Sequence, residues 1–192
     1  MSEPPSPRIV NGSLVSIRRL EVEDARVLLD LRVRNRTFLE PWEPLRAEDW
    51  YSLAAQIEDI EAGLDDWQHD RGYRLAIVRG GCVIGGVSLS EVVRGVFDNA
   101  YLGWYVDKAH GRLGFGTEAV RLLIDFAFAD ALLHRVQAAI IPRNVASLRL
   151  ARKVGFREEG LALRYLRING TWEDHKLFAL TSEEWTTEAL SR

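Results

Sequence analysis

Hydrophobic and polar residues follow two different periods along the chain, and these periods predict both helices and strands. Six apolar residues recur at steps of three and four, as on one face of an amphipathic helix: Trp50, Leu53, Ile57, Ile60, Leu64 and Trp67. Residues 74–79 and 82–89 are β-prone runs around Gly80-Gly81, and this pattern predicts a hairpin. Residues 161–168 and 172–180 around Asn169-Gly170 predict a second hairpin.

Weaker signals place the remaining elements. We expect strands over 14–20, 101–106 and 135–141, and helices over 21–33, 117–132 and 146–154, the last ending at Gly155. Residues 35–44 contain two prolines and predict a loop. Thr181 and Glu184 have the spacing of a capping box. The resulting order, β-α-α-β-β-β-α-β-α-β-β, predicts an α/β (α+β) fold with a mixed sheet and helices on its faces.

Length and charge narrow the class of protein. With 192 residues, of which 47% are hydrophobic and 28% charged, the chain is expected to form one globular domain over 13–185. Residues 1–12 and 186–192 are expected to be tails. A net charge of −3 disfavours nucleic acid or an anionic membrane as a partner. The single cysteine, Cys82, the lack of a signal-peptide pattern, and the charges that interrupt residues 119–133 predict a cytoplasmic protein.

The strongest chemical signal is a glycine-rich turn between a strand and an apolar helix. Gly111, Gly114 and Gly116 fall within six residues, directly after the strand that ends at Val106. Glycines let the backbone approach a ligand closely, and the first N–H groups of a helix attract anions. A pyrophosphate site and a plain tight turn are both compatible with this pattern. It is neither a Walker loop nor a Rossmann turn, whose spacings differ.

Residues 111–116, Gly-Arg-Leu-Gly-Phe-Gly, resemble the Gln/Arg-x-x-Gly-x-Gly/Ala signature by which GNAT acetyltransferases bind the pyrophosphate of coenzyme A. Glycine stands where Gln or Arg is usual, and Arg112 follows one place later. Further stretches are similar to the RimJ/RimL group of that family: residues 133–136, 142–147, 153–160, 165, 169–170, 172–175 and the loop 36–44. The resemblance implies a mostly antiparallel sheet with helices on both faces.

The resemblance also implies a set of site residues. The residues expected at acetyl-coenzyme A are Val106, Gly111, Arg112, Leu113, Gly114, Phe115, Gly116, Thr117, Asn144 and Ser147. In this family Asn144 would contact the pantetheine arm, and Ser147 would protonate the leaving thiolate. From the residues alone, both could simply cap the helix that follows them. The aromatic residues and the acid expected at the acceptor are Trp42, Glu43, Tyr101, Tyr105 and Tyr165.

The general base is the least defined part of the predicted site. The strand before the glycine turn, residues 99–105, contains no acid, and neither does the stretch 164–167. Glu91 and Glu43 remain as candidates, each also compatible with a surface acid, and a water chain could replace them. The four histidines (His69, His110, His134 and His175) lack metal-binding spacing, so no metal is expected.

The expected activity is transfer of an acetyl group from acetyl-coenzyme A to a primary amine. The RimJ/RimL resemblance implies that the acceptor is the α-amino group of a protein N-terminus, that of a ribosomal protein. A small amine (an antibiotic, polyamine or amino acid) is the enzymatic alternative. A non-catalytic acyl-coenzyme A-binding module is a third reading, favoured by the missing base. The sequence is also compatible with a homodimer.

Overall fold

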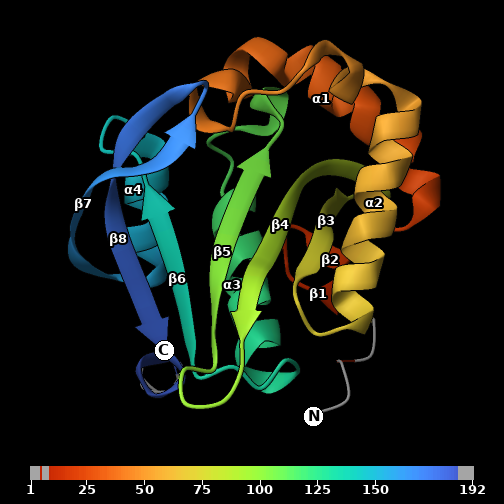
Figure 1. The fold of residues 1–192 in the computed structure, drawn as a ribbon. Coiled ribbons are helices and arrows are strands. Elements are labelled where there is room, and N and C mark those ends of the chain that lie inside the picture. Colours follow the sequence, from red (N-terminus) through yellow and green to blue (C-terminus); the bar gives the residue numbers. More distant parts are fainter. Residues whose placement is uncertain (1–4, 6–8, 186–192) are drawn as a thin grey trace.

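Figure 1 shows a computed structural model of the chain, which describes residue 5 and residues 9–185. The strands are β1 (Val10–Asn11), β2 (Ser16–Arg19), β3 (Tyr73–Arg79), β4 (Cys82–Val93), β5 (Asn99–Val106), β6 (Arg135–Ile140), β7 (Arg157–Ile168) and β8 (Thr171–Thr181). The α-helices are α1 (Ala25–Leu39), α2 (Leu53–Gln68), α3 (Phe115–Ala129) and α4 (Val145–Val154). Short 3-10 helices cover Val22–Asp24, Glu40–Trp42, Glu48–Tyr51 and Lys108–His110.

The strands form one eight-stranded sheet in the order β1-β2-β3-β4-β5-β6-β8-β7. Every neighbouring pair is antiparallel except β5 and β6, which run parallel. The predicted fold class is therefore confirmed. Both predicted hairpins are present, since β3 pairs with β4 and β7 pairs with β8.

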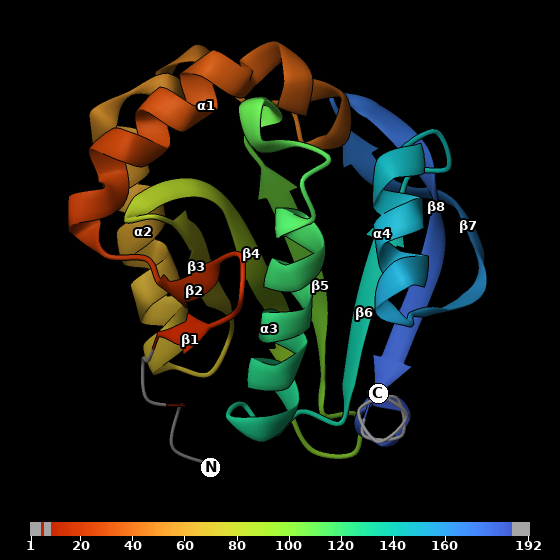
Figure 2. The same ribbon diagram turned by 180° about the vertical axis from the view of Figure 1, so that it is seen from behind.

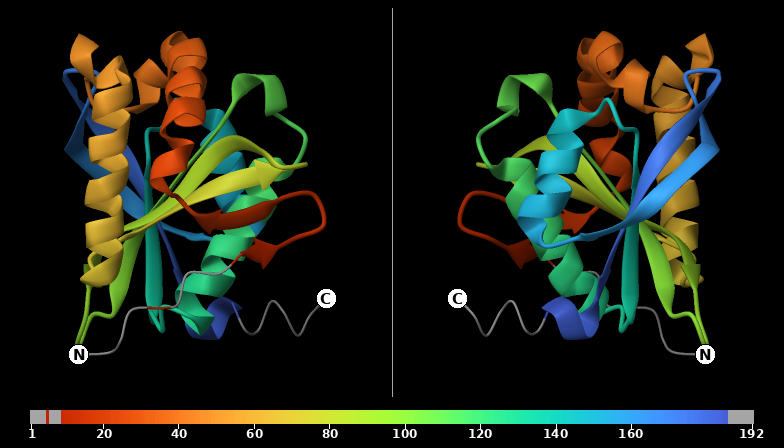
Figure 3. Two further views of the ribbon diagram at one scale, coloured as in Figure 1. Left: turned by 90° about the vertical axis from the view of Figure 1, so that its right-hand side faces the viewer. Right: turned by 90° about the vertical axis from the view of Figure 1, so that its left-hand side faces the viewer.

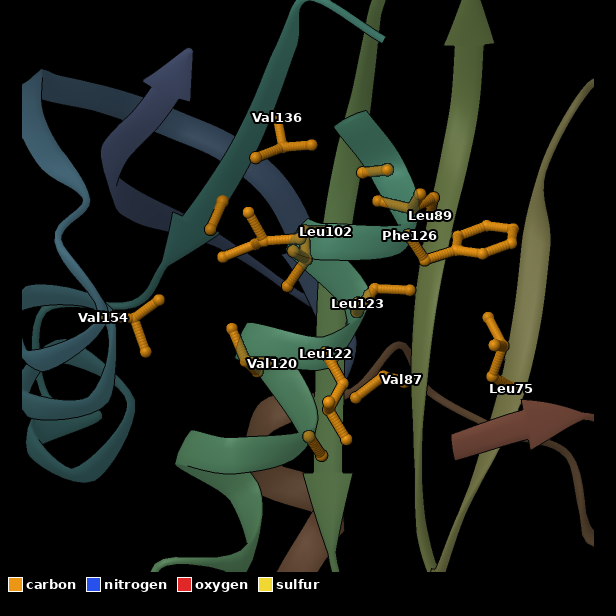
Figure 4. Close-up of a cluster of buried hydrophobic side chains, with 14 of the residues drawn as sticks. Leu75, Val87, Leu89, Leu102, Val120, Leu122, Leu123, Phe126, Val136 and Val154 are labelled. Atoms are coloured by element: carbon orange, nitrogen blue, oxygen red, sulfur yellow. The ribbon is translucent and has the colours of Figure 1, made fainter. Parts of the chain in front are cut away.

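Helices cover both faces of the sheet. Figure 3 shows α1 and α2 on one side and α3 with α4 on the other, and Figure 2, the view from behind, shows α3 in front of the middle strands. The main core lies between α3 and the sheet, where Leu123 and Phe126 of α3 meet Leu89 and Leu102 of the strands (Figure 4). Because α3 has eight buried residues, burial of its apolar face holds the centre of the fold together.

Several element boundaries differ from the predicted ones. Residues 35–39 belong to α1 and are not a loop; Pro41 then sits in the first turn of the 3-10 helix Glu40–Trp42. Proline is compatible with a first helical turn because that position needs no N–H donor, so the two prolines end the helix later than the pattern indicated. Helix α3 begins at Phe115, two residues before the predicted start, because Gly114 is its N-cap.

Both ends of the chain also bear on the prediction. Val10–Asn11, assigned to the tail by the sequence, pair with β2 as strand β1. Residues 1–4 and 6–8 of the predicted N-terminal tail and the predicted tail 186–192 lie outside the described residues. The Glu184 carboxylate accepts a hydrogen bond from the Thr181 N–H at 2.9 Å, as in the predicted capping box. No helix in the described part of the chain is long and apolar enough to cross a membrane.

A carboxylate on α3 fixes the turn between β1 and β2. Glu118 accepts hydrogen bonds from three successive backbone N–H groups, those of Ser13, Leu14 and Val15, at 2.7–2.9 Å. A Cβ at Gly12 would come within 2.8 Å of this carboxylate, so glycine is required for the close approach. The N-terminal strands are thereby attached to the first turn of α3.

We expect Glu118→Ala to lower the free energy of unfolding by about 2 kcal/mol, because three amides lose a charged acceptor. Glu118→Gln should lose less, since its amide oxygen still accepts. Chemical denaturation would measure both, with Glu61→Ala, a change at an exposed carboxylate on α2, as the control. Equal stability of the Glu118→Ala and Glu61→Ala variants would contradict this account of the turn.

Candidate active site

The parallel pair β5 and β6 separates after only three residue pairs, of which Tyr101 and Gln137 are the last. Beyond that point β5 stays paired with β4 as far as Val106, while β6 stays paired with β8 as far as Ile140. Each strand thus follows its own neighbour, and the two diverge toward the top of Figure 1. We call this opening, beyond Tyr101 and Gln137, the fork. It leaves the facing backbone edges of β5 and β6 without a ladder partner.

The glycine turn lies between the end of β5 and the start of α3. The backbone N–H groups of residues 112–117 have no hydrogen-bond acceptor among the described residues. Gly114 caps the helix with φ +86°, and Arg112, which is exposed, has φ +64°. Successive amides at a left-handed turn and a helix N-terminus favour a bound anion.

Close packing brings α3 against β5 at this turn. A Cβ at Gly116 would lie 3.3 Å from Val106 Cγ2 and 3.4 Å from Leu150 Cδ1 of α4, so a larger residue would require these two side chains to shift. Phe115 is buried beneath the guanidinium of Arg79, whose Cζ lies 4.4 Å from the ring centroid. Leu113 is exposed and Thr117 half-buried. The residues predicted at the pyrophosphate therefore form one continuous turn.

The start of the glycine turn is attached to α1 by a buried carboxylate. Asp107 accepts hydrogen bonds from Nε and Nη2 of Arg34 at 2.9 and 2.7 Å and from the N–H of Ala109 at 3.1 Å. Burial alone would raise the pKa of the Asp107 carboxyl, but these hydrogen bonds outweigh burial and hold the pKa below its usual value. Asn35 also accepts from the Lys108 N–H at 2.9 Å. Two neighbouring residues of α1 thus position the turn.

Asn144 and Ser147 lie at the N-terminus of α4, directly after the end of β6. Asn144 is the N-cap, and its Oδ1 accepts a hydrogen bond from the Ser147 N–H at 3.1 Å. The capping role foreseen for Asn144 is therefore present. The half-buried Ser147 hydroxyl makes no hydrogen bond to another described residue, and remains available to a ligand.

On the opposite face of the sheet, Tyr105 and Glu43 come together through Arg32 of α1. The Arg32 guanidinium stacks on the Tyr105 ring at 3.8 Å and donates to the Glu43 carboxylate at 2.7 Å. The Tyr105 ring also lies across Gly86 of β4, where a Cβ would come within 2.7 Å of it. Burial raises the pKa of the Tyr105 phenol, and the Arg32 charge only partly opposes this shift. The Tyr105 phenol is thus an uncharged group on this face of the sheet.

Tyr101 and Tyr165 meet on the same face. Their hydroxyl oxygens are 3.0 Å apart, joining β5 to β7 across the fork. The hydrogen bond between them and burial raise the pKa of Tyr165 to about 12. The Tyr165 phenol is therefore a neutral hydrogen-bonding group near neutral pH.

Trp42 and Glu43 belong to a frame that connects α1 to the β7–β8 hairpin. The Asn169 N–H donates to the Glu43 carbonyl at 2.9 Å, and Arg143 donates to the Pro41 carbonyl at 3.2 Å. Arg143 also pairs with Glu173 at 2.7 Å and stacks over Trp42 at 5.4 Å. We call this set of contacts the acceptor frame. It places Trp42 and Glu43 beside the hairpin that carries Tyr165.

Glu91 does not join the other predicted site residues. It is exposed, has φ +52°, and lies at a register shift between Ser90 and Val93, where β4 pairs with the first residues of β5. The fork opens at the other end of β5. The sequence suggested Glu91 because it follows a strand, but the bulge and the direction of that strand place it away from the glycine turn.

Several residues that shape the site lacked a local sequence signal. The sequence pattern assigns Arg32 only to a helix, leaves Arg34 just beyond its predicted end at residue 33, and assigns Asp107 no role of its own. An acid directly after a strand that leads into a glycine turn was the one visible hint for Asp107. The ion pair between Arg34 and Asp107 joins residues 73 positions apart, which no local pattern can indicate.

The residues present fit the pyrophosphate of coenzyme A. Six successive amides without a partner among the described residues, a left-handed glycine at the helix start, and the close approach of Gly116 to Val106 and Leu150 form a cradle for an anion. Bound acetyl-coenzyme A would supply the acetyl group as a thioester.

Comparison with known proteins gives the same result. Residues 15–157 match the family model described as "Acetyltransferase (GNAT) domain". The chain is 38% identical over 178 residues to "Probable N-acetyltransferase YjcK" of Bacillus subtilis (strain 168), covering 92% of this chain and 98% of that protein. It is 33% identical over 198 residues to the "[Ribosomal protein uS5]-alanine N-acetyltransferase" of Escherichia coli (strain K12), covering 96% of each.

A solved structure agrees in fold. Mycobacterium smegmatis RimJ in complex with CoA-disulfide superimposes with a TM-score of 0.86 at 31% identity, covering 95% of this chain and 88% of that chain. Relatives of this kind are enzymes, so the reading as a non-catalytic binding module gives way to the enzymatic one. The chain belongs to the GNAT family and is an acetyl-coenzyme A-dependent acetyltransferase.

Proposed function

We propose that this acetyltransferase modifies the α-amino group of a protein N-terminus, with a ribosomal protein as the acceptor. The observation that carries the proposal is the extent of the similarity to the uS5-alanine enzyme, which covers 96% of both chains. Coverage on that scale takes in the acceptor side (residues 36–44 and 165–175) as well as the coenzyme turn. A ribosomal-protein acceptor would place the reaction in the cytoplasm.

One face of the fork binds the coenzyme, and the other face binds the acceptor. The amides of residues 112–117 bind the pyrophosphate, and Asn144 and Ser147 at the start of α4 face the pantetheine arm and the thioester sulfur. On the other face, Tyr101, Tyr105 and Tyr165 together with the acceptor frame hold the N-terminal residues of the acceptor. An aromatic wall with hydroxyl and carbonyl groups suits an extended peptide, whose backbone needs both apolar contact and hydrogen bonds.

Mass spectrometry of an acceptor panel tests the proposal. The wild-type chain with acetyl-coenzyme A should acetylate a peptide that begins with Ala at its α-amino group. The same peptide with a blocked α-amine and a free lysine side chain should stay unmodified. If spermidine or another small amine is acetylated and the peptide is not, the acceptor is a small molecule and the proposal is wrong.

Gly114→Ala should weaken binding of coenzyme A by about tenfold, or about 1.4 kcal/mol. Alanine disfavours the left-handed conformation, and relief of that strain would turn the amides of residues 115 and 116 away from the anion. Calorimetry with coenzyme A measures the change. Gly95→Ala is the matched control, since Gly95 has φ +85° in the β4–β5 loop and no atom within 4 Å of its Cβ position. Equal affinity of both variants for coenzyme A would contradict the assignment of the pyrophosphate site to this turn.

Ser147→Ala should lower kcat by about 10²-fold if the hydroxyl protonates the leaving thiolate. Affinity for acetyl-coenzyme A should be unchanged. The Asn144 cap uses the backbone N–H of residue 147 and survives the change, so thermal stability should stay close to that of the wild type. Steady-state release of free coenzyme A measures turnover, and a wild-type rate would exclude Ser147 from proton transfer.

A further inference from the structure

The buried side chain of His175 has one ring nitrogen that no contact with a described residue accounts for. His175 on β8 is only 2% exposed. Its Nδ1 lies 3.0 Å from the carbonyl oxygen of Glu173. A carbonyl oxygen only accepts hydrogen bonds, so Nδ1 carries a proton, and in the neutral imidazole Nε2 then keeps a lone pair. Nε2 has no hydrogen-bond partner among the residues that the structure describes.

Strand alternation places His175 on the acceptor side of the sheet. Phe178 and Leu180 of β8 point into the core beneath α3, so His175, an odd number of positions away, points to the opposite face. Tyr101 lies on that face as well, because its neighbours Ala100 and Leu102 are in the same core. The ring of His175 is 5.8 Å from that of Tyr165, whose hydroxyl contacts Tyr101.

Strand register places His175 at the open end of the fork. Ile140 and Lys176 are the last paired residues of β6 and β8, so His175 is the next residue of β8 beyond them. Asn144 and Ser147 follow β6 at this same end. In Figure 1 no helix lies in front of β6 and β8 on this face.

The other titratable groups on this face are engaged. Tyr101 and Tyr165 share a hydrogen bond between their hydroxyl groups, and this bond together with burial raises the pKa of Tyr165 to about 12. Glu43 pairs with Arg32, and Glu173 pairs with Arg143. His175 makes no ion pair with a described residue, and an imidazole nitrogen can take up a proton and release it again.

We propose that His175 accepts the proton that the acceptor amine must lose, through a water molecule at Nε2. The inference rests on acetyl transfer to an amine, whichever amine that is. The proton of the ammonium passes by way of this water to Nε2 and later to solvent. The amine nitrogen then bonds to the acetyl carbon while the carbon–sulfur bond breaks, and its electron pair leaves with sulfur. The second nitrogen proton ends on that sulfur through Ser147.

His175→Asn is the sharpest variant. The asparagine amide can still donate to the Glu173 carbonyl, but it has no counterpart of Nε2. We expect kcat/KM for the accepted amine to fall by about 10²-fold, with unchanged affinity for acetyl-coenzyme A in calorimetry. In the variant kcat/KM should rise with pH as the acceptor amine itself loses its proton, because no imidazole takes that proton from the bound ammonium. His69→Asn is the matched control, because His69 also places Nδ1 on a backbone carbonyl, at 2.9 Å from Asp65, but is exposed on α2.

A second pair of measurements separates proton transfer from a purely structural role. A peptide beginning with trifluoroalanine has a weakly basic amine that is already neutral, so the His175→Asn defect should be much smaller with it than with alanine. Long-range proton–nitrogen NMR of the wild-type chain should find the proton on Nδ1 of His175, and this needs no variant.

A proton on Nε2, a wild-type rate for His175→Asn, or an equal defect with both peptides would overturn the inference. If the wild-type chain acetylates a small amine and no peptide, the acceptor proposal fails separately, and the pH profile of His175→Asn is then measured with that amine.

Discussion

The short ladder between β5 and β6 is the constraint on which the site depends. Three parallel pairs hold the two halves of the sheet together, and beyond Tyr101 and Gln137 each strand stays with its antiparallel neighbour. The separation has two consequences. The N-terminus of α3 can lie at the opening with its amides unpaired, and polar side chains from both halves can face one another across it. A fully paired sheet would bury both sets of groups and leave no room for a thioester between them.

Helix α1 links the two sides of the fork. Arg34 holds Asp107 at the start of the glycine turn, while Arg32, two residues earlier, stacks on Tyr105 and pairs with Glu43 in the acceptor frame. One rigid helix therefore sets the position of the coenzyme turn and of the acceptor wall together. A change at Arg34 therefore acts on the glycine turn through Asp107, and a change at Arg32 acts on Tyr105 and Glu43.

Sequence patterns were sufficient for the parts of the site that are local. The glycine turn, both hairpins and the helix stop at Gly155 depend on residues close together in the chain, and the structure contains each of them. The acceptor side depends on distant pairs, such as Tyr101 with Tyr165 and Asn169 with Glu43, which only the folded sheet brings together. For the same reason His175 was visible as a histidine, whereas its burial and its single carbonyl partner were not.

The charge pattern of the acceptor side explains why an acid is a poor choice of base here. Glu43 and Glu173 each face a guanidinium at 2.7 Å, and both belong to contacts that hold the frame against the sheet. A carboxylate that took up a proton would give up its ion pair, and the frame would loosen at the moment when the acceptor has to be held. A neutral imidazole can gain a proton and lose it again while its other nitrogen keeps its hydrogen bond. The arginines therefore fix the acids as structural groups, and proton transfer falls to a residue outside their reach.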